Sequence, residues 1–507
     1  MTRAPFYLTT AIHYVNGPPH LGHTYEMVTS DAICRYKRMR DFDVRFGTGT
    51  DEHGVKVQRR AEEAGVTEQQ WCDQIAEQFR AAWDRLNISH DHFIRTTEPR
   101  HVTVVQELLR RIHEAGDLYE GVYEGLYCSG CEAFKTEKDL VDGDCPDHKR
   151  PPEPVKEHNL FFRLSRFAEP LLEHIRTNPS FIQPDYRRNE VIANIEAGLD
   201  DVSMSRESVS WGVPIPFAEN ATVYVWFDAL INYVSALGLD TDLYERYWPA
   251  TVHVIGKDIT RFHCIYWPAM LMSAGIPLPE SIFAHGFVLS TGGEKLSKSL
   301  GNTSDPLDLV DQVGADPLRW YLCSEITYGR DGAFSFDRFE EIYNSHLAND
   351  IGNLASRTLN MVAKYRGSIP TPRLGQEHVI EDAIDRAIIA YSDAMDRYAL
   401  HEACAAVRRL SGVLNEQVQA RAPFSLAKDP DKADELDGLL FALVAGVQLV
   451  ATLAWPFMPS KMSAIREWLA LGEQAPGWIN DRSQLFDEVA VGASVEKPSP
   501  LFPRLGS

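Results

Sequence analysis

Two histidines stand three residues apart, with one glycine between them, at the point where a helical pattern begins. The stretch PPHLGHTYE (18–26) contains His20 and His23 directly after a proline pair. The first turn of a helix offers unpaired backbone N–H groups and a partial positive charge, which together attract phosphate. Gly22 lets the backbone approach such a ligand closely, and the imidazoles add side-chain donors. The stretch predicts a phosphate site, although histidine pairs at turns are more often ordinary surface or core residues.

A second element with compatible chemistry lies late in the chain. The stretch GGEKLSKS (292–299) carries Lys295, Ser297 and Lys298 on glycine-containing sequence typical of a loop. A mobile cationic loop can close over a triphosphate, where each lysine ammonium acts as a point charge. By itself such a stretch is usually solvated surface. Together with the histidine pair, it predicts a site for a nucleoside triphosphate.

Four residues of metal-ligand type are spaced as two short chelating pairs. Two residues lie between Cys128 and Cys131, two lie between Cys145 and His148, and thirteen residues separate the pairs. This pattern on turn-forming sequence suits a tetrahedral Zn²⁺ ion with all four positions filled by protein, which is the arrangement of a structural metal. We expect one such zinc ion per chain. The remaining cysteines are isolated and are expected to be small core residues: Cys34, Cys72, Cys264, Cys323 and Cys404.

The elements that must position the phosphate residues alternate between β-rich runs and amphipathic helices. The helix that follows the histidine pair is expected at about 21–40. Candidate strands lie at 6–10, 43–51, 251–258 and 281–289. This alternation predicts an α/β fold with a Rossmann-like parallel sheet wrapped by helices. The interval from about 117 to 222, which contains the cysteine pairs, must then be an insertion between the two halves of the sheet.

Strand patterns vanish from about residue 346 onward, and helical periodicity takes over. Apolar side chains recur every three or four residues, for example at Ile380, Ile384 and Ile388. The pattern predicts a C-terminal α-helical bundle. Loops are expected at 370–376 and 427–435, and the tail from about 490 is expected to be loosely ordered.

Composition excludes some classes of function. The 507-residue chain has a formal net charge of −22, which argues against indiscriminate binding to nucleic acids or membranes but not against local basic patches.

The N-terminus lacks the charged region and apolar run of a secretory signal, so we expect a cytoplasmic protein. The most apolar stretch, 438–458, is broken by Gln448 and stopped by Pro456, which favours a buried core helix over a membrane span.

The two phosphate elements, in this order in one α/β domain, resemble the paired HIGH and KMSKS signatures of class I aminoacyl-tRNA synthetases. Leucine replaces isoleucine in the first signature and methionine in the second. Longer blocks extend the resemblance over nearly the whole chain and narrow it to the methionyl-tRNA synthetase family: TTAIHYVNGPPHLGH, FGTGTDEHG, DHFIRTTEPRH, GLDDVSMSRESVSWGVPIP, VYVWFDALINY, VIGKDITRFHCIYWPAML and NDIGNLASR. In that family, the methionine carboxylate attacks the α-phosphate of ATP and releases pyrophosphate. The methionyl group then passes to the terminal ribose of tRNA(Met).

The resemblance implies roles for individual residues. The catalytic residues would contact the phosphates from two sides, with Mg²⁺ carried by ATP: His20, His23, Lys295 and Lys298. Further ATP contacts would come from Thr10, Gly22, Gly256, Asp258 and Ser297. Asp51 would hold the substrate ammonium group, and the thioether pocket would comprise Ile12, Tyr14, Trp226, Ala229, Tyr233, Ile259 and His263. Aromatic rings favour polarisable sulfur, but one methyl group is worth only about 1–3 kcal/mol, so homocysteine would be imperfectly rejected.

The resemblance also implies an anticodon site and a tRNA partner. Asn349, Asn353 and Arg357 follow one another at intervals of four, on one helix face, and match family positions that read the CAU anticodon. Phe424 stands where the family commonly has a tryptophan that stacks on a base, a change that stacking tolerates. The expected partners are elongator and initiator tRNA(Met), methionine and ATP. We also expect a monomer, because the chain stops without the additional tRNA-binding domain that makes some relatives dimers.

The implied domains follow the motifs along the chain. They are the first half of the catalytic domain, the zinc-bearing connective insertion, the second half of the catalytic domain, a KLSKS-containing segment that contacts the tRNA stem, and the helical anticodon-binding domain. Their expected bounds are 1–116, 117–222, 223–290, 291–345 and 346–507.

Three alternatives compete with this interpretation. Class I synthetases for isoleucine, leucine and valine carry a large editing domain, for which the roughly 275 residues between His20 and Lys295 leave no room; a cysteine enzyme would hold zinc in its amino-acid pocket. A non-catalytic tRNA-binding relative would tolerate loss of the phosphate-binding residues, which are all present here. A ligase of the pantothenate-synthetase type shares the histidine pair but has no use for an anticodon-reading bundle.

Overall fold

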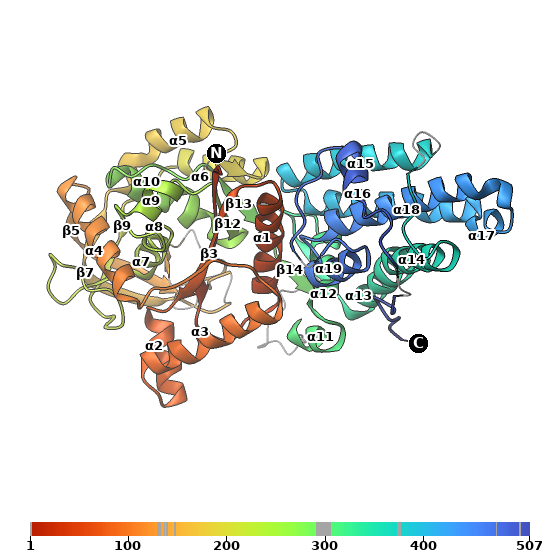
Figure 1. Ribbon diagram of the computed structural model, residues 1–507. Helices are drawn as coiled ribbons and strands as arrows, with labels where there is room; N and C mark the ends of the chain where they lie inside the picture. Colours follow the sequence, from red (N-terminus) through yellow and green to blue (C-terminus); the bar gives the residue numbers. More distant parts are fainter. Residues whose placement is uncertain are drawn as a thin grey trace.

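The chain forms two bodies that lie side by side in the computed structural model (Figure 1). The structure describes residues 3–128, 133–135, 137, 140–146, 149–290, 306–372, 377–472, 474–495 and 498–506. The N-terminal body contains most of the strands, and the C-terminal body is helical. The predicted fold class, a parallel-sheet domain followed by a helical domain, is confirmed.

The main sheet has seven strands in the order β2-β3-β1-β12-β13-β8, with β4 paired to β3, and every pairing is parallel. The strands are β1 (Pro5–Thr10), β2 (His13–Tyr14), β3 (Asp43–Asp51), β4 (His92–Arg95), β8 (Ile182–Gln183), β12 (Val252–Gly256) and β13 (Ile282–His285). Strand β1 lies between β3 and β12, so the strand order reverses there. Ligands of open α/β sheets bind beyond the carboxyl ends of the strands at such a reversal.

Helix α1 (Leu21–Met39) lies at the border between the two bodies and begins directly after His20. It packs on β1, β3 and β12 on one side and on α12 (Ala315–Glu325) on the other, so nearly all of its side chains are buried. The other helices of this part of the chain are α2 (Val55–Ala64), α3 (Glu68–Arg85) and α4 (Pro99–Glu114).

The insertion between the halves of the main sheet forms an antiparallel sheet of its own, in the order β6-β5-β7-β9. Its strands are β5 (Leu118–Cys128), β6 (Ala133–Lys135), β7 (Glu153–Phe162) and β9 (Val202–Ser203). Helices α5 (Ala168–Thr177) and α6 (Asp185–Glu196) follow β7. Strand β8 leaves this layer and extends the main sheet beside β13, with Ile182 opposite Ile282. The sequence interval of the insertion therefore contributes to both sheets.

The run at 281–289 is two strands and not one. After β13 the chain bends at Gly286, where an added Cβ would lie 2.2 Å from the backbone of Arg330. Strand β14 (Val288–Ser290) then pairs with β15 (Gly332–Phe334) in a separate small parallel sheet. The single strand expected there is wrong because a close backbone approach, invisible in the local pattern, divides it.

Several short elements lie between residues 205 and 273, around the ends of the strands. They are β10 (Ser205–Arg206), β11 (Thr222–Val223), α7 (Val225–Leu230), α8 (Asn232–Ser235), α9 (Asp242–Tyr247) and α10 (Trp267–Ser273). A π-helix, η4 (Phe262–Tyr266), precedes α10.

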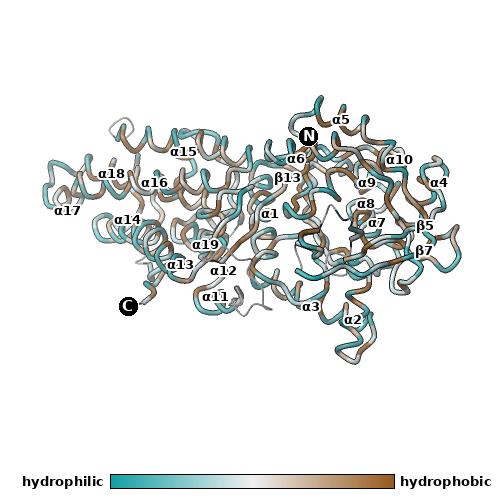
Figure 2. The backbone as a smooth tube through the Cα atoms, turned by 180° about the vertical axis from the view of Figure 1, so that it is seen from behind, coloured by the Kyte–Doolittle hydropathy of each residue, from teal (hydrophilic) through white to brown (hydrophobic). Residues whose placement is uncertain are grey.

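The C-terminal body consists of helices that pack on one another: α11 (Pro306–Val313), α12, α13 (Phe336–Ile342), the π-helix η6 (Tyr343–Gly352), α14 (Asn353–Tyr365), α15 (His378–Asp396), α16 (Leu400–Arg421), α17 (Pro423–Leu426), α18 (Ala433–Ala454), α19 (Pro459–Trp468) and α20 (Arg482–Glu488). Within the described part of this body, β15 is the one strand, and it precedes residue 346. Figure 2 shows hydrophilic residues along outer helices such as α2 and α17.

Helix α18 carries the most apolar stretch of the sequence. The span Pro430–Ala454 is long and apolar enough to cross a membrane, yet 94% of its most apolar window is buried inside the protein. Gln448 itself is only 1% exposed. The expectation of a buried core helix is confirmed.

The last described segment is more ordered than its composition suggested. Ser494 forms an isolated β-bridge with Ser368, and both Leu501 and Phe502 are buried. The carbonyl oxygen of Leu501 accepts a hydrogen bond of 3.0 Å from Nζ of Lys461 in α19. The expectation of a loosely ordered tail is wrong, because two apolar anchors fix it on the helices.

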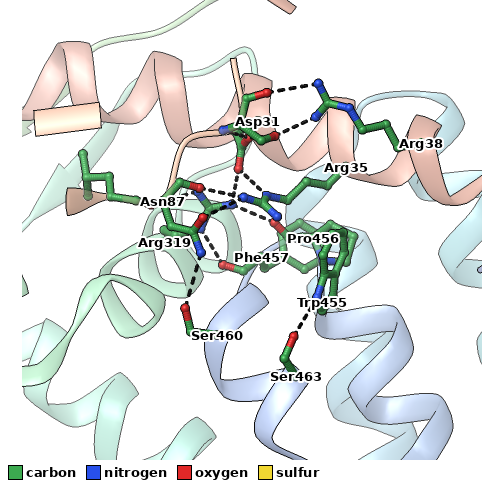
Figure 3. Close-up of polar contacts among 12 residues, drawn as sticks. Asp31, Arg35, Arg38, Asn87, Arg319, Trp455, Pro456, Phe457, Ser460 and Ser463 are labelled. Carbon is green, nitrogen blue, oxygen red and sulfur yellow. Dashed lines mark hydrogen bonds and ion pairs between the residues drawn. The ribbon is translucent and has the colours of Figure 1, made fainter. Parts of the chain in front are cut away.

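A buried ionic network joins α1 to the C-terminal body (Figure 3). Asp31 of α1 and Arg319 of α12 have no solvent exposure, and Oδ2 of Asp31 lies 2.7 Å from Nη2 of Arg319. Nε of Arg35 donates to the same oxygen at 2.7 Å. Arg319 also donates to the carbonyl oxygens of Pro456 and Phe457, at the corner between α18 and α19. The helix that begins at the histidine pair is thus tied to the helical body by charged groups.

Candidate active site

A cavity of about 290 Å³ lies beyond the carboxyl ends of β1 and β12, where the strand order reverses. Its wall combines the ends of these strands with the start of α1 and with residues of α7, α8 and η4. It brings together most of the site residues predicted from the sequence: Ile12, Tyr14, His20, Gly22, His23, Asp51, Trp226, Ala229, Tyr233, Gly256, Asp258, Ile259 and His263.

The histidine pair caps helix α1 reciprocally. Nδ1 of His20 accepts hydrogen bonds from the backbone N–H groups of Gly22 (3.1 Å) and His23 (3.4 Å). Nδ1 of His23 accepts one from the backbone N–H of His20 (3.3 Å). An imidazole that accepts at Nδ1 carries its proton on Nε2 when neutral, so both rings keep an Nε2–H donor. The rings stack with centroids 3.7 Å apart on the cavity wall.

Gly22 is required by this cap. A Cβ at position 22 would lie 3.0 Å from Cε1 and 3.1 Å from Nδ1 of the His20 ring, closer than a normal van der Waals contact. The glycine therefore lets the His20 imidazole fold back over the first turn of the helix. This close approach explains why a residue without a side chain stands between the two histidines.

His13 is a third imidazole of this wall that the sequence analysis did not single out. Its ring centroid lies 4.8 Å from that of His23, and it stacks on Phe79 at 5.1 Å. Burial, together with the nearby His20, lowers the pKa of His13 to about 3. His13 therefore backs the pair as a neutral ring. Nothing in its local sequence distinguished it from a core residue.

The predicted thioether pocket contains a hydrogen-bonded tyrosine and histidine. Nδ1 of His263 lies 3.0 Å from the carbonyl oxygen of Ile259, and its Nε2 lies 2.6 Å from the hydroxyl oxygen of Tyr233. A carbonyl oxygen only accepts, so Nδ1 carries the proton and Nε2 accepts from the tyrosine. Burial lowers the pKa of His263 to about 4, which keeps this tautomer neutral. Trp226 completes the aromatic wall, stacked on Phe262 at 3.8 Å.

The loop that follows Asp51 is held by a buried carboxylate between two imidazoles. Oδ2 of Asp228 lies 2.6 Å from Nδ1 of His53, and Oδ1 lies 2.8 Å from Nε2 of His101. Tyr14 donates its hydroxyl proton to the carbonyl oxygen of His53 at 3.1 Å. Asp228 belongs to α7, which also carries Trp226. The network therefore joins the predicted ammonium site to the helix that carries the thioether pocket.

A second ionisable pair lines the side of the cavity nearest β13. Nε2 of His285 lies 2.9 Å from Oε2 of Glu26, and both residues are buried. Burial alone would lower the pKa of His285, but the hydrogen bond and the charge of Glu26 outweigh it and raise that pKa. Glu26 follows His23 by three residues on α1. That helical spacing was a usable signal for a cavity residue, and the sequence analysis missed it.

Of the residues predicted to bind ATP, Thr10 does not line the cavity and three others cannot be placed. Thr10 is fully buried, and its hydroxyl donates to Oγ1 of Thr48 at 2.8 Å, so its side chain points into the domain. Lys295, Ser297 and Lys298 lie outside the described residues. The strand that precedes them, β14, begins at Val288, which lines the cavity. For the metal site, Cys131 and His148 also lie outside the described residues.

The two described residues of the predicted metal site each pair with the residue five positions later in the sequence. Cys128 pairs with Ala133 at the end of β5, and Cys145 forms an antiparallel bridge with Arg150. Both cysteines are buried, at 1% and 0% exposure. In the sequence, Cys131 and His148 each follow the described cysteine at the same interval. Among the described residues no group of three His, Cys, Asp or Glu side chains is placed to hold a metal ion.

The predicted anticodon residues lie along one helical path of the C-terminal body. Asn349 and Arg357 are exposed and Asn353 is half-buried. The path is not a uniform α-helix, because Asn349 lies in the π-helix η6 and Asn353 begins α14. π-helical turns are rare and frequent at functional sites. Phe424 in α17 is 53% exposed, as a base-stacking ring must be.

Contacts at both ends of α14 show how it runs relative to Phe424. At its start, Asp350 accepts hydrogen bonds from Ser411 (2.8 Å) and Asn415 (2.9 Å) of α16. At its end, Arg366 contacts Asp437 near the start of α18. Helix α14 thus runs beside α16 toward α17, the helix that contains Phe424.

Comparisons with known proteins agree with this geometry. The family model described as tRNA synthetases class I (M) matches residues 6–151 and 147–359, and that described as the anticodon binding domain of methionyl tRNA ligase matches residues 371–506. A methionine–tRNA ligase of Caldanaerobacter subterraneus is 43% identical over 99% of this chain and 79% of its own length. One of Thermosynechococcus vestitus is 42% identical over 99% of this chain and 97% of its own.

A solved structure is similar over the same extent. Mycobacterium tuberculosis methionyl-tRNA synthetase in complex with methionyl-adenylate matches with a TM-score of 0.92 and 41% sequence identity. The match covers 99% of this chain and 100% of that one.

Proposed function

The chain belongs to the methionyl-tRNA synthetase family, and we propose that the cavity at the ends of β1 and β12 is where it joins methionine to ATP. Its activity is that of a methionine–tRNA ligase, which activates L-methionine with ATP to methionyl-adenylate and transfers the methionyl group to tRNA(Met). The reaction requires positioning of two substrates and neutralisation of charge on the phosphates, with no covalent enzyme intermediate.

The single observation that carries the assignment of the site is the reciprocal cap at the start of α1. It commits Nδ1 of His20 and of His23 to the backbone, so each neutral ring carries its proton on Nε2 at the cavity wall. Such preorganised donors stabilise charge that develops in a transition state. The helix start adds its own partial positive charge. We assign both imidazoles to the ATP phosphates, and Lys295 and Lys298 to the opposite side.

Methionine fits the other half of the cavity. A carboxylate at Asp51 suits the substrate ammonium group, and the aromatic wall of Trp226 and Tyr233 suits a polarisable sulfur. The neutral His263 accepts from Tyr233, which leaves the pocket uncharged. An uncharged pocket favours a thioether over a charged side chain. Gly256 and Asp258 at the end of β12 are assigned to the nucleotide, with Mg²⁺ bound to the ATP.

The test uses variants that keep the helix cap. His20→Asn retains an N-cap acceptor, and His23→Gln retains an acceptor at the third helical position, but each loses the Nε2–H donor. Methionine-dependent ATP–pyrophosphate exchange is expected to fall about a hundredfold in each variant, with the KM for methionine and the melting temperature unchanged. His378→Gln, at a side chain 77% exposed, is the matched control. Exchange at full rate in either cap variant would refute the assignment.

For the C-terminal body, we propose that Asn349, Asn353, Arg357 and Phe424 read the CAU anticodon. The exposed ring of Phe424 and the polar path along η6 and α14 support this. Elongator and initiator tRNA(Met) share that anticodon, so both are proposed substrates. Replacing each residue by alanine should raise the KM for tRNA and leave ATP–pyrophosphate exchange unchanged. A cytoplasmic monomer remains a prediction, which cell fractionation and sedimentation of the purified protein would test.

We also propose that Cys128, Cys131, Cys145 and His148 hold one structural zinc ion. The buried positions of Cys128 and Cys145, and the pairing of each with the residue five positions later, fit a pair of chelating turns. Such an ion would fix the loops of the insertion. Elemental analysis should find one zinc per chain in the purified protein and less in Cys128→Ser. A protein without zinc whose insertion resists proteolysis as well as the wild type would refute the proposal.

A further inference from the structure

The last described segment, 498–506, lies against the π-helix η6. Phe502 is 5% exposed and meets Tyr343 at right angles, with ring centroids 6.1 Å apart. Its ring also lies over Gly352, where an added Cβ would come within 3.0 Å of it. This packing places the residues after Phe502 beside the predicted anticodon path.

Two asparagines of η6 hold this segment by hydrogen bonds. Asn344 accepts from the backbone N–H of Leu505 (3.0 Å) and donates to its carbonyl oxygen (3.2 Å). Oδ1 of Asn349 accepts from Nε (3.0 Å) and Nη2 (2.6 Å) of Arg504. The asparagines are five residues apart, a separation that turns by about 140° in an α-helix. A π-helix joins residues five apart by hydrogen bonds, so both face the segment.

The guanidinium group fixes the orientation of the Asn349 amide. Arginine has donors and no acceptor, so only the amide oxygen can face Arg504. The NH₂ group is then directed away from the guanidinium. Its nitrogen, Nδ2, makes no hydrogen bond within the part of the protein that the structure describes. Held in this way, Asn349 presents donors and no acceptor.

A fixed amide recognises bases differently from a rotating one. Cytosine offers acceptors at O2 and N3 beside the donor at N4, and single-stranded anticodon bases are read on such edges. A rotating amide can turn its oxygen toward a donor of a wrong base, whereas a fixed one leaves that donor unpaired. Specificity arises from this kind of penalty as much as from good contacts.

We propose that Arg504 is a positioning residue for anticodon recognition, which holds Asn349 in its donor orientation toward an acceptor edge of an anticodon base. The proposal rests on the anticodon role assigned to Asn349 and adds to it the residue that sets its hydrogen-bonding polarity. Arg504 acts through Asn349, and the segment that carries it is docked by Phe502 and Leu505.

The test compares aminoacylation of tRNA transcripts that carry CAU or a single-base change in the anticodon. Arg504→Gln should raise the KM for the CAU transcript about fivefold, since the contact is exposed, and leave kcat and ATP–pyrophosphate exchange unchanged. The preference for CAU over the changed anticodons should fall. Arg504→Lys, which keeps a cationic donor, should recover part of that preference. Asn344→Ala, which undocks Leu505, should shift KM in the same direction as Arg504→Gln.

The control is Arg386→Gln, at an exposed arginine of the same body that pairs with Asp382 at 3.6 Å; it should leave all transcripts unaffected. In Asn349→Ala, the added Arg504→Gln change should have no further effect. A raised KM in Asn349→Ala with a normal KM in Arg504→Gln would overturn the positioning role and leave the anticodon site intact. An equal loss for every transcript, with a weaker salt dependence, would overturn it in favour of a phosphate contact. No effect in Asn349→Ala would instead refute the proposed anticodon role.

Discussion

Oδ2 of Asp228 lies 2.6 Å from Nδ1 of His53, so α7 is joined directly to the loop that follows Asp51. The other carboxylate oxygen accepts from His101 at 2.8 Å. Burial of Asp228 would raise its pKa, but the two imidazoles outweigh burial and hold that pKa below its usual range. The carboxylate thus serves two N–H donors at once, one from each side.

Asp228→Asn is expected to weaken methionine binding selectively. An asparagine replaces one of the two carboxylate oxygens by an NH₂ group, which cannot accept from the imidazole on that side, so the loop that follows Asp51 loses one anchor. The KM for methionine in ATP–pyrophosphate exchange should rise about tenfold, with the KM for ATP unchanged. Asp240→Asn, at a carboxylate 65% exposed, is the control. A lower melting temperature with a normal KM for methionine would show that the network supports only the fold.

Acid stability should depend on Asp31. Burial would raise the pKa of Asp31, but Arg319 and Arg35 outweigh it and lower that pKa to about 2. A depressed folded pKa contributes stability that is complete above the unfolded value near 4 and is lost as the pH falls toward 2. The contribution is about 2 kcal/mol. Asp31→Asn should lower the melting temperature most at neutral pH, because it leaves two buried arginines without their carboxylate.

The measurement is thermal unfolding of the wild type and Asp31→Asn from pH 7 down to pH 2. The difference in melting temperature should shrink below pH 4, where the wild type also loses its carboxylate charge. Asp311→Asn, at an exposed partner of Arg85, should track the wild type throughout. A difference that is constant with pH would contradict the assignment of a charged Asp31.

Two substitutions of His263 should separate the effect of its hydrogen bond from the effect of its packing in the thioether pocket. His263→Gln keeps an acceptor for the Tyr233 hydroxyl, whereas His263→Leu leaves that buried hydroxyl unpaired. The leucine variant should show a KM for methionine about tenfold higher than the glutamine variant. Because burial lowers the pKa of His263 to about 4, methionine binding by the wild type should not lose this acceptor until the pH falls toward 4. Equal KM values in the two variants would rule out the hydrogen bond as the cause.

Local patterns were sufficient to predict the elements that carry the site. The strands β1 and β3, the helix that starts after His20, and the run at 251–258 that contains β12 follow from β-rich runs between amphipathic helices and from helix-start signals. Because parallel strands bring their carboxyl ends to one edge, these predictions also placed most of the cavity residues together. The family blocks supplied Trp226 and Tyr233, which periodicity alone would have assigned to the core.

The features that the sequence did not reveal depend on contacts between distant parts of the chain. Strand β8 joins the main sheet only because β13 offers it an edge, and the bend at Gly286 exists because the backbone of Arg330 approaches it. The π-helices η4 and η6 add one residue per turn without a sequence signal. His13 and Arg504 gain their roles from neighbours 10 and 155 residues away in sequence, His23 and Asn349.

Gly22→Ala should separate helix stability from catalysis. Alanine is favoured over glycine in a helix by about 1 kcal/mol, so the change would ordinarily stabilise α1. Its Cβ, however, would lie 3.0 Å from the His20 ring, and the ring can escape only by giving up its hydrogen bonds to the backbone. Because the lost cap bonds offset the gain from alanine, we expect a melting temperature close to that of the wild type, together with an exchange rate lower by about tenfold or more.

Gly412→Ala provides the matched comparison. Gly412 lies inside α16, and no atom lies within 4 Å of the position that its Cβ would occupy. It should gain stability, because it gives up no cap bond, and keep full activity. If both alanine variants retain full exchange, the His20 ring is not held where the reciprocal cap places it, and the tautomer that the cap imposes on the phosphate site loses its support. If only Gly22→Ala loses exchange while its melting temperature holds, the glycine serves the position of the imidazole and not the stability of the helix.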